Sequence, residues 1–255
     1  MMRILTSVVL IPTVTWLILF SPQPVFQAAI AVFALLCWHE FAGLAGYYNA
    51  KLVSWHGWIP GLVILYAGLS GTMVMTVIIL GALAAALRNR ELKEGIPATA
   101  FFALGLIYAF GAWRAAVELR VISPYWVLFA NAINWVGDSA AYFVGRAIGK
   151  RKLAPRISPG KSVEGAVASV ALDTVFGVIF VNYFLPGTPW YVAVGVSVAG
   201  NMAGQIGDLA ESALKRGAGV KDSGTLLPGH GGWLDRLDSS LFSMPITLFV
   251  LTLIG

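Results

Sequence analysis

Long apolar runs separated by short polar breaks constrain the fold of this chain more than any other feature. Clear examples run from Ile4 to Phe20, from Phe26 to Cys37 and from Gly61 to Leu87. A membrane-crossing helix needs roughly 20 mostly apolar residues, and backbone groups in lipid must be hydrogen-bonded internally, which favours helices. Since 58% of the 255 residues are hydrophobic and only 11% are charged, a soluble domain is disfavoured. The sequence predicts an all-α integral membrane protein.

Pro, Gly and charged clusters divide the apolar runs into about nine expected transmembrane helices. These helices fall near residues 4–20, 25–46, 58–70, 71–87, 96–113, 122–146, 164–185, 189–209 and 239–254. We expect the first helix to be uncleaved, because no small-x-small cleavage site precedes the polar break after it. No repeat or water-soluble segment divides the chain. We therefore predict one polytopic membrane domain over 1–255, with N-terminal helices at 1–120 and the functional half at 121–255.

The net charge of +5 is concentrated in alternate loops between these helices. The basic loops lie at residues 51, 88–93, 146–161 and 215–236. Positive charge marks the cytoplasmic side of a membrane protein, so we expect a cytoplasmic N terminus and no nucleic-acid partner. The only cysteine is Cys37, which excludes an intrachain disulfide and a Cys-based zinc site.

Two of the expected helices carry polar residues along one face. The first stripe consists of Asn131, Asn134 and Asp138, and the second of Asn201, Gln205, Asp208, Glu211 or Ser212, and Lys215. Spacings of three or four residues place each set on one side of its helix. Such residues serve either as hydrogen-bonding contacts between helices or as the lining of a polar cavity. We favour the cavity for Asp138 and Asp208 and leave the asparagines open.

Four further charged residues lie within the expected helices but belong to no stripe. Arg114 and Arg120 depart from the positive-inside pattern. Glu40 has no metal-type spacing, so we expect structural pairing or a place in a cavity wall. Asp173 fits a buried pair with a basic residue as well as it fits a function. All four are left out of the predicted site.

Two of the expected cytoplasmic loops contain candidate phosphate-binding residues. The loop at 149–162 holds several cations, and Arg156, Ser158 and Lys161 are its candidate contacts. Such a loop attracts anionic headgroups or phosphates, although a basic loop that only sets topology is the alternative. The loop near residues 211–238 alternates acids, cations and glycines.

Asp208 and Asp235 are candidate ligands for Mg²⁺, which takes oxygen ligands and is often bound by one or two carboxylates plus substrate phosphates. Nearby cations can neutralise those phosphates. A zinc site or a nucleophilic triad is disfavoured, because His230 is the only histidine in this half of the chain. The residues favour metal-assisted chemistry on phosphates at the membrane surface.

The run from Ser212 to Asp238 resembles the signature of the phosphatidate cytidylyltransferases, also called CDP-diacylglycerol synthases. That signature has Ser, then Lys-Arg, four free residues, Lys-Asp, a small residue, Pro or Gly, His-Gly-Gly, and Asp-Arg before a final Asp; all are present. Trp233 departs from it, since the family has an aliphatic residue or Phe there. Residues 138–149 and 153–165 resemble two further conserved blocks, so the likeness covers about 134–238.

The resemblance implies transfer of CMP from CTP to phosphatidic acid in the bacterial inner membrane, with the site in a polar cavity open to the cytoplasm. It also implies Mg²⁺ and a second cation, K⁺, held between Asp208 and Asp235, and a homodimer. We predict catalytic roles for Asp208, Asp235, Lys215, Lys221, Asp222 and His230. The predicted substrate contacts are Asp138, Arg156, Ser158, Lys161, Glu211, Ser212, Arg216, Gly231, Gly232, Arg236 and Asp238.

Three other functions each fit part of the sequence. A CTP-dependent lipid-alcohol kinase would use the same nucleotide but transfer its γ-phosphoryl group to a hydroxyl. A transporter would use the polar stripes as an ion path. The sequence signal of a transporter is a pair of broken helices in two inverted halves, and it is not evident here. A structural membrane scaffold would explain the helices but not the stripes.

Overall fold

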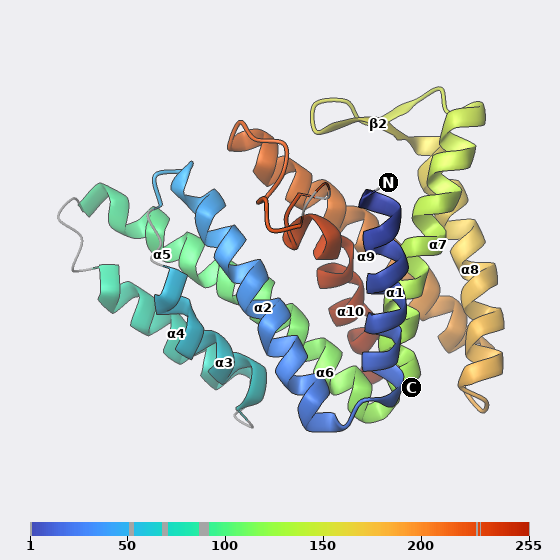
Figure 1. Cartoon of the computed structure of the whole chain (residues 1–255), viewed down its shortest axis with the longest axis horizontal. Coiled ribbons are helices and arrows are strands. Elements are labelled where there is room, and N and C mark those ends of the chain that lie inside the picture. The colour runs from blue at the N-terminus through green and yellow to red at the C-terminus, as the bar shows by residue number, and fades with distance from the viewer. Residues whose placement is uncertain are drawn as a thin grey trace.

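The computed structural model describes residues 2–50, 54–67, 71–86, 92–227, 229 and 231–254. These residues form nine helical segments (Figure 1), in agreement with the predicted number. They are α1 (Met2–Phe20), α2 (Gln23–Gly46), α3 (Trp58–Tyr66) after the short turn η1 (Ser54–Gly57), α4 (Gly71–Ala86), α5 (Leu92–Leu106) continuing through the π-helical η2 (Ile107–Gly111) into α6 (Ala112–Ile122), α7 (Pro124–Ile148), α8 (Val163–Phe184), α9 (Trp190–Gly217) and α10 (Leu234–Ile254).

Four of these segments are long and apolar enough to cross a membrane: residues 23–46, 95–122, 163–184 and 234–254. They make the chain a multi-pass membrane protein. Helix α3 has nine residues, about 13.5 Å of helix, which is less than half of a hydrocarbon core about 30 Å thick. Among the described residues, the helices that are long and apolar enough to cross a membrane are therefore fewer than the nine transmembrane helices expected from the sequence.

The loop predicted at 149–162 is a two-stranded antiparallel hairpin rather than irregular chain. Strand β1 (Lys152–Ala154) pairs with β2 (Ser158–Ser162), and β2 leads directly into α8. Glu164 in the first turn of α8 accepts hydrogen bonds from the backbone N–H groups of Lys150 and Arg151. The predicted all-α class holds for the described residues, and this short hairpin lies within the loop expected between two helices.

Polar contacts join α7 to α10 in the interior of the bundle. Asn134 donates to Ser243 Oγ at 3.0 Å, and Ser240 donates to Asn131 Oδ1 at 3.0 Å. All four side chains are buried. The two asparagines that the sequence left open are hydrogen-bonding contacts between helices.

A second polar cluster joins α8 to α9. Asn201 donates to Ser169 Oγ at 2.8 Å and to Asp173, and Gln205 donates to Asn201 Oδ1 at 2.6 Å. Asp173 is fully buried. Its partner is therefore an amide on the neighbouring helix, whereas the sequence suggested a basic residue as one of two possibilities.

The two arginines that departed from the charge pattern bind backbone carbonyl groups near helix ends. Arg114 donates to the carbonyls of Ile64 and Ala67 at the end of α3. Arg120 donates to those of Ile18 and Ser21 at the end of α1. The carbonyl end of a helix carries partial negative charge, so both positive charges are compensated inside the protein.

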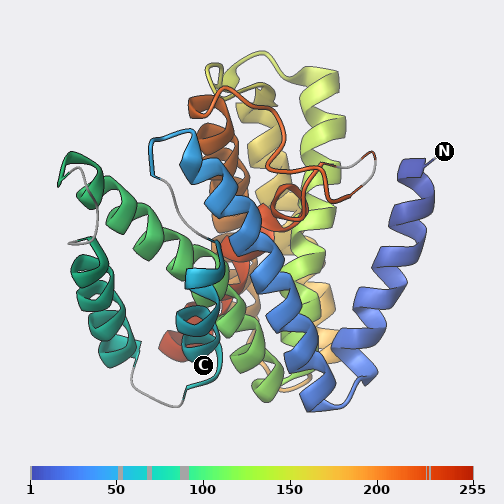
Figure 2. The same ribbon diagram turned by 60° about the vertical axis from the view of Figure 1, so that its left-hand side comes forward.

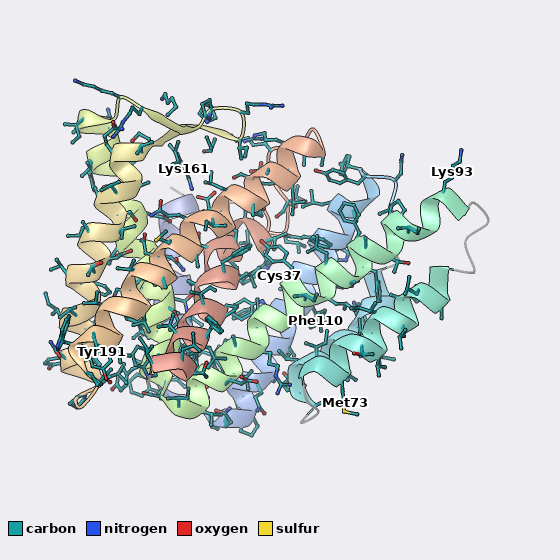
Figure 3. The ribbon with its side chains drawn as sticks, turned by 180° about the vertical axis from the view of Figure 1, so that it is seen from behind. Cys37, Met73, Lys93, Phe110, Lys161 and Tyr191 are labelled. Carbon is teal, nitrogen blue, oxygen red and sulfur yellow. The ribbon has the colours of Figure 1, made fainter. Side chains whose placement is uncertain are left out.

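The two termini lie at opposite ends of the helical bundle, and two of the basic residues lie at the same end as the hairpin. In Figure 1 the N-terminal end of α1 lies on the same side of the bundle as the hairpin. The C-terminal end of the chain, at the end of α10, lies on the opposite side. Figure 3 shows Lys93 and Lys161 both at the upper end of the molecule, on opposite sides of it, and Met73 and Tyr191 at the lower end. These two basic residues therefore lie at the same end of the molecule.

Candidate functional site

The candidate site lies where the end of α9, the start of α10 and the β-hairpin meet. Figures 1 and 2 show the segment between α9 and α10 at this end of the bundle, with α2 beside it. Helix α9 packs against both α8 and α10. This packing brings together residues that are far apart in sequence.

Asp208 lies at the centre of the site. It forms an ion pair with Lys161, which reaches it from β2 (Figure 3). Ser212, one turn further along α9, donates to Asp208 Oδ1 at 3.2 Å. The carboxylates of Asp138 and Asp238 are close enough to interact electrostatically with Asp208. Asp208 on α9 therefore pairs with a lysine from the hairpin and lies near one acid from α7 and one from α10.

Lys215 is buried between two carboxylates. It forms ion pairs with Glu211, one turn earlier in α9, and with Asp235 in α10. Both residues on α9 lie beyond 209, where the expected transmembrane helix ends. Burial raises the pKa of the Glu211 carboxyl to about 8, against the effect of Lys215. Burial alone would lower the pKa of Lys215, but its hydrogen bonds to Asp235 and Glu211 raise it above the ordinary value.

Asp235 organises the loop that precedes α10. Its Oδ2 atom accepts hydrogen bonds from the backbone N–H groups of Ser223 at 2.9 Å and Gly232 at 2.8 Å. Gly231 has a φ of 82°, and a Cβ there would lie 2.6 Å from Asp235 Oδ2. Glycine is required at this position, because an L side chain rarely adopts that φ and would also meet the carboxylate.

Several other predicted residues lie at the exposed rim of the site. Lys221 and Asp222 line a pocket of about 430 Å³ between the loop and α2. Arg216 donates to the carbonyl of Val220 at 3.0 Å, which closes the turn after α9. Arg236 is exposed and lies near enough to Asp138 for their charges to attract.

The remaining predicted residues belong to the hairpin and the glycine loop. Arg156 is exposed between the two strands, and Ser158 begins β2 opposite Ala154. Gly232 is buried beside Asp235. His230 lies outside the described residues.

The donor chemistry at Asp208 and Asp235 fits Mg²⁺, a hard cation that prefers carboxylate oxygens. Each carboxylate already binds an ammonium group, from Lys161 and Lys215 respectively, so both positions accept a cation. The described residues contain no cluster of three or more acidic, histidine or cysteine side chains suited to a metal. Mg²⁺ commonly keeps several waters and is completed by substrate phosphates, so this sparse set is compatible with it.

Glu40 and Ser223 contact the residues of the candidate site, although the sequence interpretation did not include them in it. Glu40 on α2 accepts hydrogen bonds from the backbone of Trp233 and Leu234 and from the Ser223 hydroxyl. The only sequence signal was a carboxylate inside an apolar run. Trp233, the departure from the signature, stacks on Phe33 of α2 with ring centroids 5.2 Å apart.

Comparisons with known proteins show which family the chain resembles. Residues 1–254 match the cytidylyltransferase family. A phosphatidate cytidylyltransferase of Bacillus subtilis (strain 168) is 43% identical over 156 residues, which are 60% of this chain and 58% of that protein. One from Staphylococcus aureus (strain COL) is 37% identical over 147 residues, covering 58% of this chain and 56% of its own length.

A longer alignment extends the similarity beyond the site. A phosphatidate cytidylyltransferase of Brucella suis biovar 1 (strain 1330) is 33% identical over 241 residues, 92% of this chain and 87% of that protein. The chain thus spans little more than half the length of the Bacillus and Staphylococcus relatives in these alignments, and most of the Brucella one. The names of these relatives give no support to the lipid-alcohol kinase.

Proposed function

Because the chain belongs to the cytidylyltransferase family, we propose that it transfers the CMP moiety of CTP to phosphatidic acid. The products are CDP-diacylglycerol and pyrophosphate, and the role is phospholipid biosynthesis. The observation that carries the proposal is the pairing of Lys161 with Asp208 and of Lys215 with Asp235 at one end of the bundle. Alternating cations and carboxylates are suited to binding phosphates together with a metal.

The reaction is a direct displacement at the α-phosphorus of CTP. An oxygen of the phosphatidic acid phosphate attacks that phosphorus, and the bond to the bridging oxygen of the β-phosphate breaks. The electron pair leaves with pyrophosphate. Positioning and electrostatic stabilisation carry most of the catalysis in such transfers, so no covalent enzyme intermediate is needed.

Lys161 and Lys215 supply positive charge to this displacement. Lys161 belongs to the hairpin and is partly exposed, so it can exchange Asp208 for a substrate phosphate. Lys215 is buried and holds Asp235 in place. The exposed cations Arg156, Lys221 and Arg236 surround the entrance for an anionic headgroup and a triphosphate. We assign His230 to a phosphate or base contact.

We propose that Asp208 and Asp235 hold Mg²⁺, with K⁺ as a second cation. The bound cations would neutralise charge that develops on the departing pyrophosphate. The support is the donor chemistry described above and the exposure of Asp208, whose side chain is 28% exposed. Asp138, Asp222 and Asp238 would then line the same polar cavity, since Asp138 and Asp238 are close enough to Asp208 for their charges to interact.

We also propose that the nine helical segments lie in the bacterial inner membrane with the N terminus and the site facing the cytoplasm. Lys93 and Lys161 at one end of the bundle support this orientation (Figure 3). Reporter fusions after Gly217 and after Gly187 should report opposite sides of the membrane. A homodimer follows from the family resemblance, and cross-linking in intact membranes tests it.

Pyrophosphate release by the purified protein tests the proposed function. With CTP and Mg²⁺, release should require phosphatidic acid, and a lipid of the mass of CDP-diacylglycerol should form in equal amount. Diacylglycerol, which has a hydroxyl but no phosphate, should not replace it. CTP consumption with diacylglycerol and without pyrophosphate release would identify a kinase instead.

A further inference from the structure

Glu40 connects the N-terminal half of the protein to the signature loop. It lies on α2, is 4% exposed and is separated in sequence from Leu234 by 194 residues. Its Oε1 atom accepts from the Trp233 N–H at 3.0 Å, and its Oε2 atom accepts from the Leu234 N–H at 2.9 Å. The first N–H groups of a helix have no partner within that helix. Glu40 therefore satisfies the start of α10 from a different helix.

The same carboxylate is linked to the candidate metal ligand by one hydroxyl. Ser223 Oγ lies 2.8 Å from Glu40 Oε2 and 3.0 Å from Asp235 Oδ2. The hydroxyl has one proton and can donate to one carboxylate at a time. Within the described residues, the hydrogen bonds of the Glu40 carboxylate come from Ser223 in this loop and from Trp233 and Leu234 at the start of α10. The site thus requires an acceptor at Glu40 on both oxygens.

The loop backbone also lies directly against Glu40. A Cβ on Gly224 would lie 2.6 Å from Glu40 Oε1, and one on Gly232 would overlap Oε2. Ser223 and Gly224 line the pocket of about 430 Å³ from the loop, and Gly43 of α2 and Tyr47, just after α2, line it as well. The contacts of Glu40 therefore fix the distance between α2 and the loop that carries Lys221 and Asp222.

We propose that Glu40 is a positioning residue for CMP transfer: it holds the loop between α9 and α10 so that Asp235 and the pocket wall keep their places. This proposal rests on the proposed function. A negative charge is suited to the place, because the N-terminal end of a helix carries partial positive charge. Glutamine is not equivalent, since its NH₂ group would face the N–H or O–H groups that donate to Glu40.

Glu40→Gln and its neighbour His39→Ala form the first matched pair of variants. His39 is exposed on the same helix, so His39→Ala should keep wild-type kcat. Glu40→Gln should lower kcat by about 100-fold, the scale expected when a reacting group is displaced by about 1 Å. A spin label at Thr225→Cys, in a Cys37→Ala background, measures the mobility of the loop in folded protein. Its spectrum should show greater mobility in Glu40→Gln than in His39→Ala.

A second pair tests the same contact with Glu40 intact. Gly224→Ala introduces a Cβ against Glu40, whereas Gly46→Ala on α2 meets no atom within 4 Å. Gly224→Ala should lower kcat and loosen the label, and Gly46→Ala should do neither. If Glu40→Gln does not fold, this pair decides the question.

The outcomes separate the inference from the proposed function. Wild-type kcat and label mobility in Glu40→Gln, or in Gly224→Ala if the first variant does not fold, would overturn the positioning role. A lower unfolding temperature with an unchanged label spectrum would also overturn it, since Glu40 would then serve stability alone. If the wild-type protein formed no CDP-diacylglycerol, the proposed function would fail, and the label would still show whether Glu40 holds the loop.

Discussion

Replacing Lys215 by methionine removes the positive charge between two buried carboxylates. The Glu211 and Asp235 side chains are 0% and 3% exposed, and that of Lys215 is 10% exposed. Breaking a buried ion pair by removing one partner costs about 3–5 kcal/mol, because the remaining charge is uncompensated. Asp235 keeps its backbone donors, and Glu211 can take up a proton because its pKa is already raised to about 8. We therefore expect the lower end, about 3 kcal/mol.

Equilibrium unfolding in mixed detergent micelles, followed by circular dichroism, measures this loss. Adding Glu211→Gln to Lys215→Met removes one of the two carboxylates, so the double variant should recover about 1–2 kcal/mol relative to the sum of the single variants. The exposed Lys93→Met is the control and should change stability by less than about 0.5 kcal/mol. Wild-type stability of Lys215→Met, or strict additivity in the double variant, would refute the buried ion pair.

Three further results are expected. Asp208→Ala and Asp235→Ala should each abolish turnover. Only Asp235→Ala should also lower stability, by about 2–4 kcal/mol, because it removes one of the two carboxylates that pair with Lys215 and leaves two N–H groups without an acceptor; equal unfolding curves would contradict this difference. Arg120→Ala should cost about 2–3 kcal/mol through its lost carbonyl hydrogen bonds and leave kcat of the folded protein unchanged, so normal stability in a denaturant titration would be inconsistent with it. EDTA should stop pyrophosphate release and added Mg²⁺ should restore it; release that persists after metal removal would exclude a metal requirement.

The sequence predicted where the helices lie more accurately than the residues at which they begin and end. The expected span at 189–209 is the first part of α9, which continues to Gly217, and the one at 239–254 is the last part of α10, which begins at Leu234. A transmembrane helix is predicted to end where charged residues begin, because lipid excludes charge. The helix itself can continue through those residues into the aqueous region. Glu211, Lys215 and Asp235 therefore lie on the helical extensions where the ion pairs form.

The sequence predicted which faces are polar but could not say what each polar residue contacts. Asn131 and Asn134 share a stripe with Asp138, yet they bind serines on α10 whereas Asp138 lies near Asp208. Periodicity places residues on one side of a helix, and tertiary packing decides which partner lies there. Glu40 escaped prediction for the same reason, since its partners are 183 to 194 residues away in sequence.

The fate of the α-phosphate of CTP tests the central claim most directly. Purified protein is given phosphatidic acid, Mg²⁺ and CTP that is labelled at either the α- or the γ-phosphate, with Asp208→Ala as the inactive control. The account predicts label in lipid only from α-labelled CTP and label in pyrophosphate from γ-labelled CTP. Lipid labelled only by γ-labelled CTP would contradict it and show phosphoryl transfer instead.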